Sequence, residues 1–251
     1  MRYPTTHITS PTFPLRAIAA LLAALPLHAC AQAQESPPAQ VVVTASREEH
    51  TSFDLPAAIS VLEAGQIRDT QLRVNASEAL VGVAGVVVQN RQNYAQDLQI
   101  SSRGFGTRSA FGVRGVRLIT DGIPATMPDG QGQAASFNLD MAERIEVLRG
   151  PFSALYGNHA GGVIQLFTRD PQGPTAIGMS VAAGSDGIRK TDINAEGKAG
   201  EVGYLLDASR FETEGYRAHS AATRDQGYAK LTTNPGSGRL TVVANYLRQH
   251  D

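Results

Sequence analysis

The sequence predicts a small α+β domain, with a mixed sheet, short helices and long loops, followed by long antiparallel β-strands. Short strand-like and helix-like segments alternate over residues 55–169. From Thr175 onward the pattern changes to tracts of about ten residues with period-two hydrophobicity. Residues 170–174, Asp-Pro-Gln-Gly-Pro, separate the two patterns as a turn-rich boundary.

The N-terminus has the composition of an export signal. Arg2 and Arg16 are followed by an apolar run of about 11 residues and by a small-x-small cleavage site at residues 31–33. A membrane-spanning helix needs about 20 apolar residues, so we expect a secretory signal peptide over residues 1–33. Cleavage there removes Cys30, the only cysteine, although residues 27–30 offer lipidation of this cysteine as an alternative.

A valine-rich segment follows the signal. Residues 34–40 contain a proline pair with polar neighbours, which is typical of an extended linker. The next residues have high strand propensity; they are Val41, Val42, Val43, Thr44 and Ala45. A β-prone peptide on a flexible linker can add a strand to the sheet edge of a partner protein. The alternative is an ordinary buried strand of the domain that follows.

The α+β domain is predicted element by element. We expect strands over residues 58–62, 86–90, 98–103, 116–120, 145–148 and 162–168. Helices are expected over residues 64–71 and 75–80, the second with the capping-box pattern of Asn75 and Glu78. Pro151 is expected to start a further helical turn. The loops 104–115 and 124–135 exceed the usual connection length, and such loops are often functional.

The second region is predicted to be a strand meander. We expect strands over residues 175–184, 188–199, 202–213, 225–234 and 239–248. Short turns join most of them, and residues 214–224 form a longer connection. Alternating tracts of this length are typical of an outer-membrane β-barrel. A soluble β-sandwich fits the same pattern.

The order of these features carries a family resemblance. The α+β domain ends in Arg-Gly-Pro-x-Ser-x-Leu-Tyr-Gly at residues 149–157. A signal peptide, a valine-rich segment, a domain with this motif and then barrel-like strands together resemble the TonB-dependent outer-membrane receptors of Gram-negative bacteria. The resemblance implies a TonB box at residues 41–45 within a linker over 34–50. It also implies a plug domain over 51–170 and the first strands of an incomplete outer-membrane β-barrel over 175–251.

The resemblance implies a function and partners. Such receptors take up a scarce ligand across the outer membrane, and a ferric siderophore or other iron chelate is the first choice for this chain. The implied partners are a TonB-type energy-coupling protein of the inner membrane, outer-membrane lipid and the metal chelate itself. The alternative is a soluble periplasmic binding or interaction module without transport. Since residues 175–251 have room for about five strands and family barrels have about 22, we expect a truncated product or a barrel completed elsewhere.

Two sets of candidate site residues follow from the resemblance. The first set lies in plug loops that we expect to face the ligand, because arginine suits anionic chelates and amides suit oxygen donors; it comprises Arg91, Tyr94, Arg108, Met127, Asp129, Gln131 and Gln133. Solvated loop residues are the alternative. The second set is expected to be structural; it comprises Arg103, Gly104, Phe105, Glu146, Arg149, Gly150, Pro151, Tyr156 and Gly157. Within it, we expect the two arginines Arg103 and Arg149 to pair with Glu143, Glu146 or barrel carboxylates, and the aromatic rings to pack in the plug or against the barrel.

Other function classes find no support in the sequence. The formal net charge of −1 gives no electrostatic reason to expect nucleic acid. Motifs of serine hydrolases, P-loop enzymes and zinc proteases are absent, and the histidines lack ligand-like spacing. We therefore expect no enzyme activity, no cofactor and no bound metal. Asp121 and Asp129 are expected to be turn formers.

Overall fold

The computed structural model describes residues 42–43, 50–51, 58–69, 71–90, 94, 97–109, 112–127, 129–150, 153–157 and 159–251. Residues Gln40–Asp251 cluster as one compact unit. In this part of the chain no helix is both long enough and apolar enough to cross a bilayer. The predicted fold class is confirmed: an α+β region (residues 58–169) precedes a sheet of long antiparallel strands.

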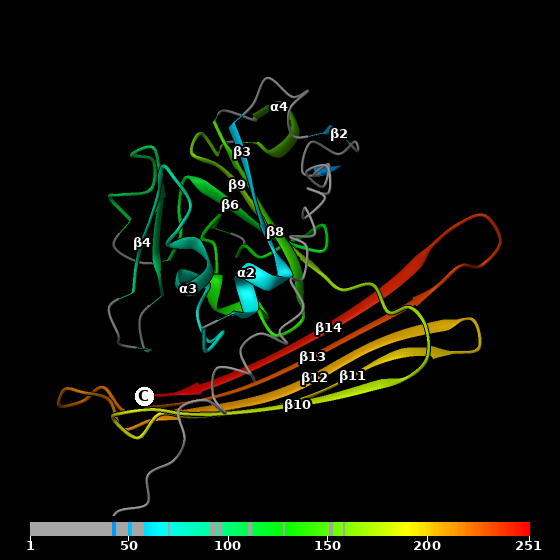
Figure 1. Cartoon of the computed structure of the whole chain (residues 1–251). Coiled ribbons are helices and arrows are strands. Elements are labelled where there is room, and N and C mark those ends of the chain that lie inside the picture. Colours follow the sequence, from blue (N-terminus) through cyan, green and yellow to red (C-terminus); the bar gives the residue numbers. More distant parts are fainter. Residues whose placement is uncertain are drawn as a thin grey trace, which may run out of the picture. The chain divides into compact units, whose positions relative to one another are not determined.

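The α+β region is built on a five-stranded mixed sheet (Figure 1). Its strands, in spatial order, are β3 (Ala58–Glu63), β8 (Ala142–Arg149), β9 (Gly162–Thr168), β6 (Val116–Thr120) and β7 (Ile123–Pro124). Among the described strands of this sheet, β6 and β9 alone pair in parallel. Gly162 begins β9 with a φ of 111°, and a Cβ there would lie 2.0 Å from the carbonyl oxygen of Leu148. Glycine is therefore required where β9 leaves its turn against β8.

Smaller elements surround this sheet. They are α2 (Ala64–Arg68), α3 (Ala76–Leu80), the antiparallel pair β4 (Val86–Gln89) and β5 (Gln99–Ser102), the 3-10 turn η1 (Ala134–Ser136) and α4 (Ser153–Tyr156). The predicted capping box at Asn75 and Glu78 is confirmed. The helix predicted over residues 64–71 is too long, because it ends at Arg68. Glu78 accepts hydrogen bonds from the backbone N–H groups of Arg73, Val74 and Asn75, which holds this segment in a non-helical turn.

A main apolar core holds the described part of the region together. Its fully buried members come from α2, α3, η1 and strands β5, β6, β8 and β9; among them are Ile67, Leu80, Ile100, Leu118, Phe137, Ile145 and Leu166. A smaller cluster packs Tyr156 with Ile119, Leu148 and Val163. Each buried side chain of this size contributes about 1.5–3 kcal/mol to folding.

The second region is an antiparallel five-stranded meander, called here the long-strand sheet (Figure 1). It consists of β10 (Ala176–Ala183), β11 (Arg189–Ala199), β12 (Val202–Thr213), β13 (Ala222–Thr233) and β14 (Leu240–His250). The predicted bounds of β12 are confirmed, whereas β13 starts three residues before the predicted Asp225. Its extra residues extend the ladder with β12, where Ala222 pairs with Thr213.

The two faces of the long-strand sheet differ in polarity. The inner face is buried and largely polar; its members include Lys190, Asp192, Asp207, Arg224, Gln226, Tyr228 and Lys230. The outer face is exposed and apolar; its members include Ile177, Met179, Val181, Ile193, Leu206, Leu231, Val242 and Tyr246. A β-sandwich buries apolar side chains and exposes polar ones, so this arrangement excludes the sandwich alternative.

Candidate functional site

A pocket of about 300 Å³ lies where loops of the α+β region meet β13 and β14. Its lining is mostly polar and comprises Asn75, Asn90, Tyr94, Asp97, Leu98, Gln133, Ala135, Arg224, Leu247 and Gln249. Two predicted ligand-facing residues, Tyr94 and Gln133, thus come together, although 39 positions (133 − 94) separate them in sequence. Convergent polar groups in a concave site are the usual mark of a ligand pocket.

Arg224 supplies the positive charge of this pocket. It is 3% exposed and donates hydrogen bonds to the side chains of Asn75 and Gln226 and to the carbonyl oxygen of Ala135. All three acceptors are neutral. The carboxylates of Glu78 and Asp140 act on Arg224 only at longer range, and both are occupied by other donors. A buried guanidinium whose described hydrogen-bond acceptors are all neutral favours an anionic group in the adjoining pocket, where Asp97 is the one carboxylate among the lining residues.

Tyr94 forms another part of the lining. Its ring lies 5.2 Å from the ring of Phe211, and its carbonyl oxygen accepts a hydrogen bond from Gln249. Burial raises the pKa of Tyr94 to about 12, and the charge of Glu78 acts in the same direction. The phenol therefore remains a neutral hydrogen-bond donor at physiological pH.

The other predicted ligand-facing residues do not line this pocket. Arg108 and Met127 are exposed on loops. Asp129 forms an exposed ion pair with Arg114 and accepts a hydrogen bond from the backbone of Gln131, as expected of a turn former. Gln131 reaches the pocket rim only through a 3.4 Å contact with Asp97. Arg91 lies outside the described residues.

Sequence reasoning missed Arg224 and Gln249 as pocket residues. Both belong to strands of the long-strand sheet, for which the sequence prediction rested on the alternation of apolar residues. The signal was nevertheless present, because Arg224, Gln226, Tyr228 and Lys230 recur at every second position. Polar residues with period two mark the face of a strand that packs on other polar groups.

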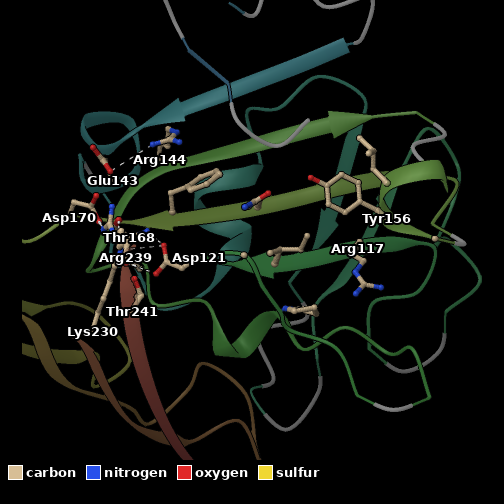
Figure 2. Close-up of a pocket in the computed structure, with 17 residues that line it drawn as sticks. Arg117, Asp121, Glu143, Arg144, Tyr156, Thr168, Asp170, Lys230, Arg239 and Thr241 are labelled. Atoms are coloured by element: carbon tan, nitrogen blue, oxygen red, sulfur yellow. Dashed lines mark hydrogen bonds and ion pairs between the residues drawn. The ribbon is translucent and has the colours of Figure 1, made fainter. Parts of the chain in front are cut away.

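A second cavity, of about 940 Å³, lies along the β6–β9 face of the mixed sheet (Figure 2). Arg117 and Tyr156 lie at one end of it, and Asp121, Lys230 and Arg239 lie at the other. Its carboxylates are paired with cations, including Asp170 with Arg239 and Glu143 with Arg144. Arg117 is the exception, because its Nε is buried and has no hydrogen-bond partner among the described residues.

Asp121 joins the two regions at the end of this cavity. It accepts hydrogen bonds from the backbone and hydroxyl of Thr168 and from the hydroxyl of Tyr228, which lies 2.7 Å away. Lys230 lies 3.6 Å from Asp121 and 3.2 Å from Asp170. Asp121 does stand in the predicted turn, with a φ of 48°, but describing it as a turn former was incomplete. It also anchors β9 to β13.

The Asp170–Arg239 contact predicts an acid-sensitive contribution to stability. Burial alone would raise the pKa of Asp170, but the hydrogen bond from Arg239 and the charge of Lys230 outweigh burial, so the pKa lies below its ordinary value. A carboxyl with a lowered folded-state pKa stabilises the fold above its unfolded-state pKa of about 3.9, and this contribution is lost as the pH falls through the folded-state value. Chemical denaturation from pH 2 to pH 7 should therefore show Asp170→Asn to be less stable than wild type near neutrality. An equal difference across the whole range would contradict this origin.

Among the described residues Arg149 binds groups other than the predicted Glu143 and Glu146, whereas the predicted acidic partner of Arg103 and the predicted pairing with barrel carboxylates stay predictions. Arg149 donates to the carbonyl oxygens of Ala58 and Ala84 and to the hydroxyl of Ser60. Glu146 is instead bound by Arg144, at 2.8 Å. Arg103 is exposed, and no described carboxylate pairs with either arginine. Arg149 is the better placed to satisfy carbonyl groups, because it ends β8 beside the first residue of β3.

The remaining structural predictions have mixed outcomes. Tyr156 packs in the α+β region as expected. Phe105 does not, because it is 49% exposed on a loop that follows β5. The predicted glycines Gly104, Gly150 and Gly157 all adopt positive φ. Pro151 lies outside the described residues.

Only part of the valine-rich segment falls within the described residues. Val42–Val43 forms strand β1 and pairs antiparallel with β2 (His50–Thr51). Val41, Thr44 and Ala45 lie outside the described residues. The two described valines thus have the extended backbone that strand addition requires.

Comparison with known proteins shows where these features recur. A family model described as TonB-dependent Receptor Plug Domain matches residues 51–163. Vitamin B12 transporter BtuB of Vibrio vulnificus (strain CMCP6) is 30% identical over 181 residues, which cover 70% of this chain and 28% of the transporter. A hemin receptor of Yersinia pestis is 31% identical over 214 residues, covering 82% of this chain and 29% of the receptor. The chain spans less than a third of the length of these relatives.

Solved structures share the same fold. The pyoverdine outer membrane receptor FpvA from Pseudomonas aeruginosa PAO1 matches with a TM-score of 0.69 at 21% identity, covering 82% of this chain and 30% of the receptor. The siderophore receptor PirA from Pseudomonas aeruginosa matches with a TM-score of 0.57 at 23% identity, covering 78% of this chain and 36% of the receptor. At these identities the likeness concerns the fold.

Proposed function

Because the chain belongs to the TonB-dependent receptors of the outer membrane, we propose that it serves energy-coupled uptake of a ferric siderophore or other anionic iron chelate. The relatives found are named for vitamin B12, hemin and siderophores, so the family leaves the ligand class open. The buried positive charge of Arg224 is the observation that favours one of these ligand classes over the others. A chelate with net negative charge compensates this buried charge more fully than a ligand without net negative charge.

The long-strand sheet supports a place in the outer membrane. Its outer face exposes Ile177, Met179 and Val181 in alternation on β10, and its inner face buries polar side chains against the α+β region. This is the pattern of a barrel strand between lipid and lumen. In this proposal the outer face contacts outer-membrane lipid and the α+β region is the plug.

Energy coupling is assigned to the valine-rich segment. We propose that residues 41–45 are the TonB box, that residues 1–33 are a cleaved signal peptide and that residues 34–50 are the linker. A TonB-type protein of the inner membrane would bind Val42 and Val43 by strand addition. The plug would extend over residues 51–170 and the first barrel strands over residues 175–251.

Ligand binding by wild type and Arg224→Gln tests the ligand class. With the full chain in outer-membrane vesicles, we expect wild type to bind a ferric catecholate siderophore or hemin more tightly than cyanocobalamin. Loss of a hydrogen bond to a charged group costs about 1.5–3 kcal/mol, so Arg224→Gln should weaken binding of the anionic probe roughly tenfold or more. Arg210→Gln is the matched control, since Arg210 is an exposed arginine that pairs with Glu212 and Asp225.

Two outcomes would contradict the proposal. Equal affinity of wild type and Arg224→Gln for every anionic probe would remove Arg224 from ligand selection. Recovery of the chain in the soluble periplasmic fraction would instead support the alternative, a binding or interaction module without transport.

A further inference from the structure

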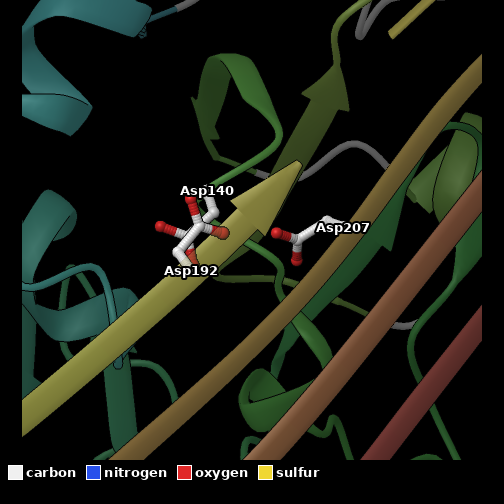
Figure 3. A group of neighbouring side chains, drawn as sticks. All are labelled: Asp140, Asp192 and Asp207. Atoms are coloured by element: carbon white, nitrogen blue, oxygen red, sulfur yellow. The ribbon is translucent and has the colours of Figure 1, made fainter. Parts of the chain in front are cut away.

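Three carboxyl groups meet on the inner face of the long-strand sheet. Asp140 precedes β8, and Asp192 and Asp207 belong to β11 and β12; one oxygen of each lies within 4.8 Å of the others. All three residues are buried, with exposures of 4%, 2% and 6% respectively. Figure 3 shows the Asp207 carboxyl turned toward the other two. Like charges this close and this deeply buried cannot all persist without compensation.

Among the described residues, cations are in direct contact with only one of the three carboxylates, that of Asp140. The ammonium group of Lys190 lies 2.8 and 2.7 Å from the two oxygens of Asp140, and Arg73 lies 2.9 Å from one of them. Lys190 also donates to the carbonyl oxygens of Leu72 and Arg73. Two cations against three carboxylates leave one negative charge in excess. Arg224 on β13 acts on Asp140 only from longer range.

The remaining two carboxyls each have one free oxygen. Oδ1 of Asp192 accepts hydrogen bonds from Asn194 and Ser180, and Oδ1 of Asp207 accepts one from Asn138. The Asn138 amide is oriented by the backbone N–H of Met141, so it must act as donor toward Asp207. The Oδ2 atoms of Asp192 and Asp207 are buried and have no partner among the described residues.

We propose that Asp192 and Asp207 share one proton at neutral pH, held between their Oδ2 atoms. The proton supplies the missing positive charge and gives both free oxygens a hydrogen-bond partner. A metal ion fits less well, because Lys190 already occupies Asp140 and the remaining donors are too few for an oxygen-coordinated cation. Because of the shared proton, the packing of residues 138–140 against the long-strand sheet depends on pH.

The proton predicts a measurable release on unfolding. When the full chain in detergent micelles is denatured at pH 7, both aspartates become exposed and ionised, so wild type should release about one proton more than Asp207→Asn. The asparagine amide replaces the shared proton as donor to Asp192. Linkage then requires the wild-type unfolding equilibrium constant to rise up to about tenfold per pH unit near neutrality, and Asp207→Asn should lose this dependence. Asp225→Asn, which removes a partly exposed carboxylate on β13, should behave like wild type.

Infrared spectroscopy of the folded proteins gives a second readout that does not depend on unfolding. We expect the carbonyl band of a protonated, buried carboxylic acid at pH 7 and its loss in Asp207→Asn. Absence of the band, together with equal proton release by wild type and Asp207→Asn, would overturn the proposal. A change in wild-type stability on addition of calcium or of a chelator would overturn it as well, because a metal ion would then hold the pair.

Discussion

Replacing Lys190 by Met should destabilise the packing of the plug on the long-strand sheet by about 3–5 kcal/mol, since removing one partner of a buried ion pair is strongly destabilising. Arg73 would then be the one described cation in contact with Asp140. Lys190 is 4% exposed and donates to four oxygen atoms, two of them on Asp140. Chemical denaturation followed by circular dichroism measures the loss. Lys198→Met, on an exposed lysine of the same strand, should change stability little.

A double-mutant cycle separates the ion pair from general damage. Combining Lys190→Met with Asp140→Asn removes both charges, so the double variant should lose less than the sum of the two single losses. Strict additivity would show that Lys190 acts independently of Asp140.

Replacing Phe137 by Ala should cost about 3–5 kcal/mol, the usual range for truncating a buried aromatic ring. Phe137 is 1% exposed and packs in the main core, directly after η1. Phe105→Ala is the matched control, because this ring is 49% exposed and its loss should be nearly neutral. A larger loss for Phe105 than for Phe137 would restore the expectation that Phe105 belongs to the core. Guanidinium denaturation of the three proteins decides between these outcomes.

Local signals in the sequence located most of the regular structure. Strands β6, β9 and β12 were predicted with their observed bounds, because period-two patterns and flanking turns are encoded within a few residues. Strand β8 begins at Ala142 rather than at the predicted Ile145, since its first residues pair with β9 across a register shift and, at Arg144, also with Glu63 of β3. The local sequence around residues 142–144 does not specify which distant strands these residues pair with.

The site was less predictable, because its chemistry depends on contacts between distant residues. Asp140 meets Lys190, Asp121 meets Tyr228 and Arg224 meets Ala135, each across at least 50 positions. A sequence pattern identifies arginine and aspartate as chemically capable but does not pair them. The family resemblance predicted the plug and its loops. It also predicted an acidic partner for Arg149, which instead donates to carbonyl oxygens among the described residues.

The contacts of Arg149 bear on how the plug responds to a pull. Residues 46–57 link the valine-rich segment to β3 along the chain, so a pull on that segment, as the proposed energy coupling requires, would reach β3 first at Ala58, which pairs with Arg149. The Arg149 side chain spans this rung by binding Ala58 and Ser60 of β3 and Ala84 of the loop before β4. Under the proposed energy coupling, we expect the bonds of Arg149 to Ala58 and Ser60 to break before the rest of the β3–β8 ladder opens, so that Arg149 would resist the first step of plug remodelling.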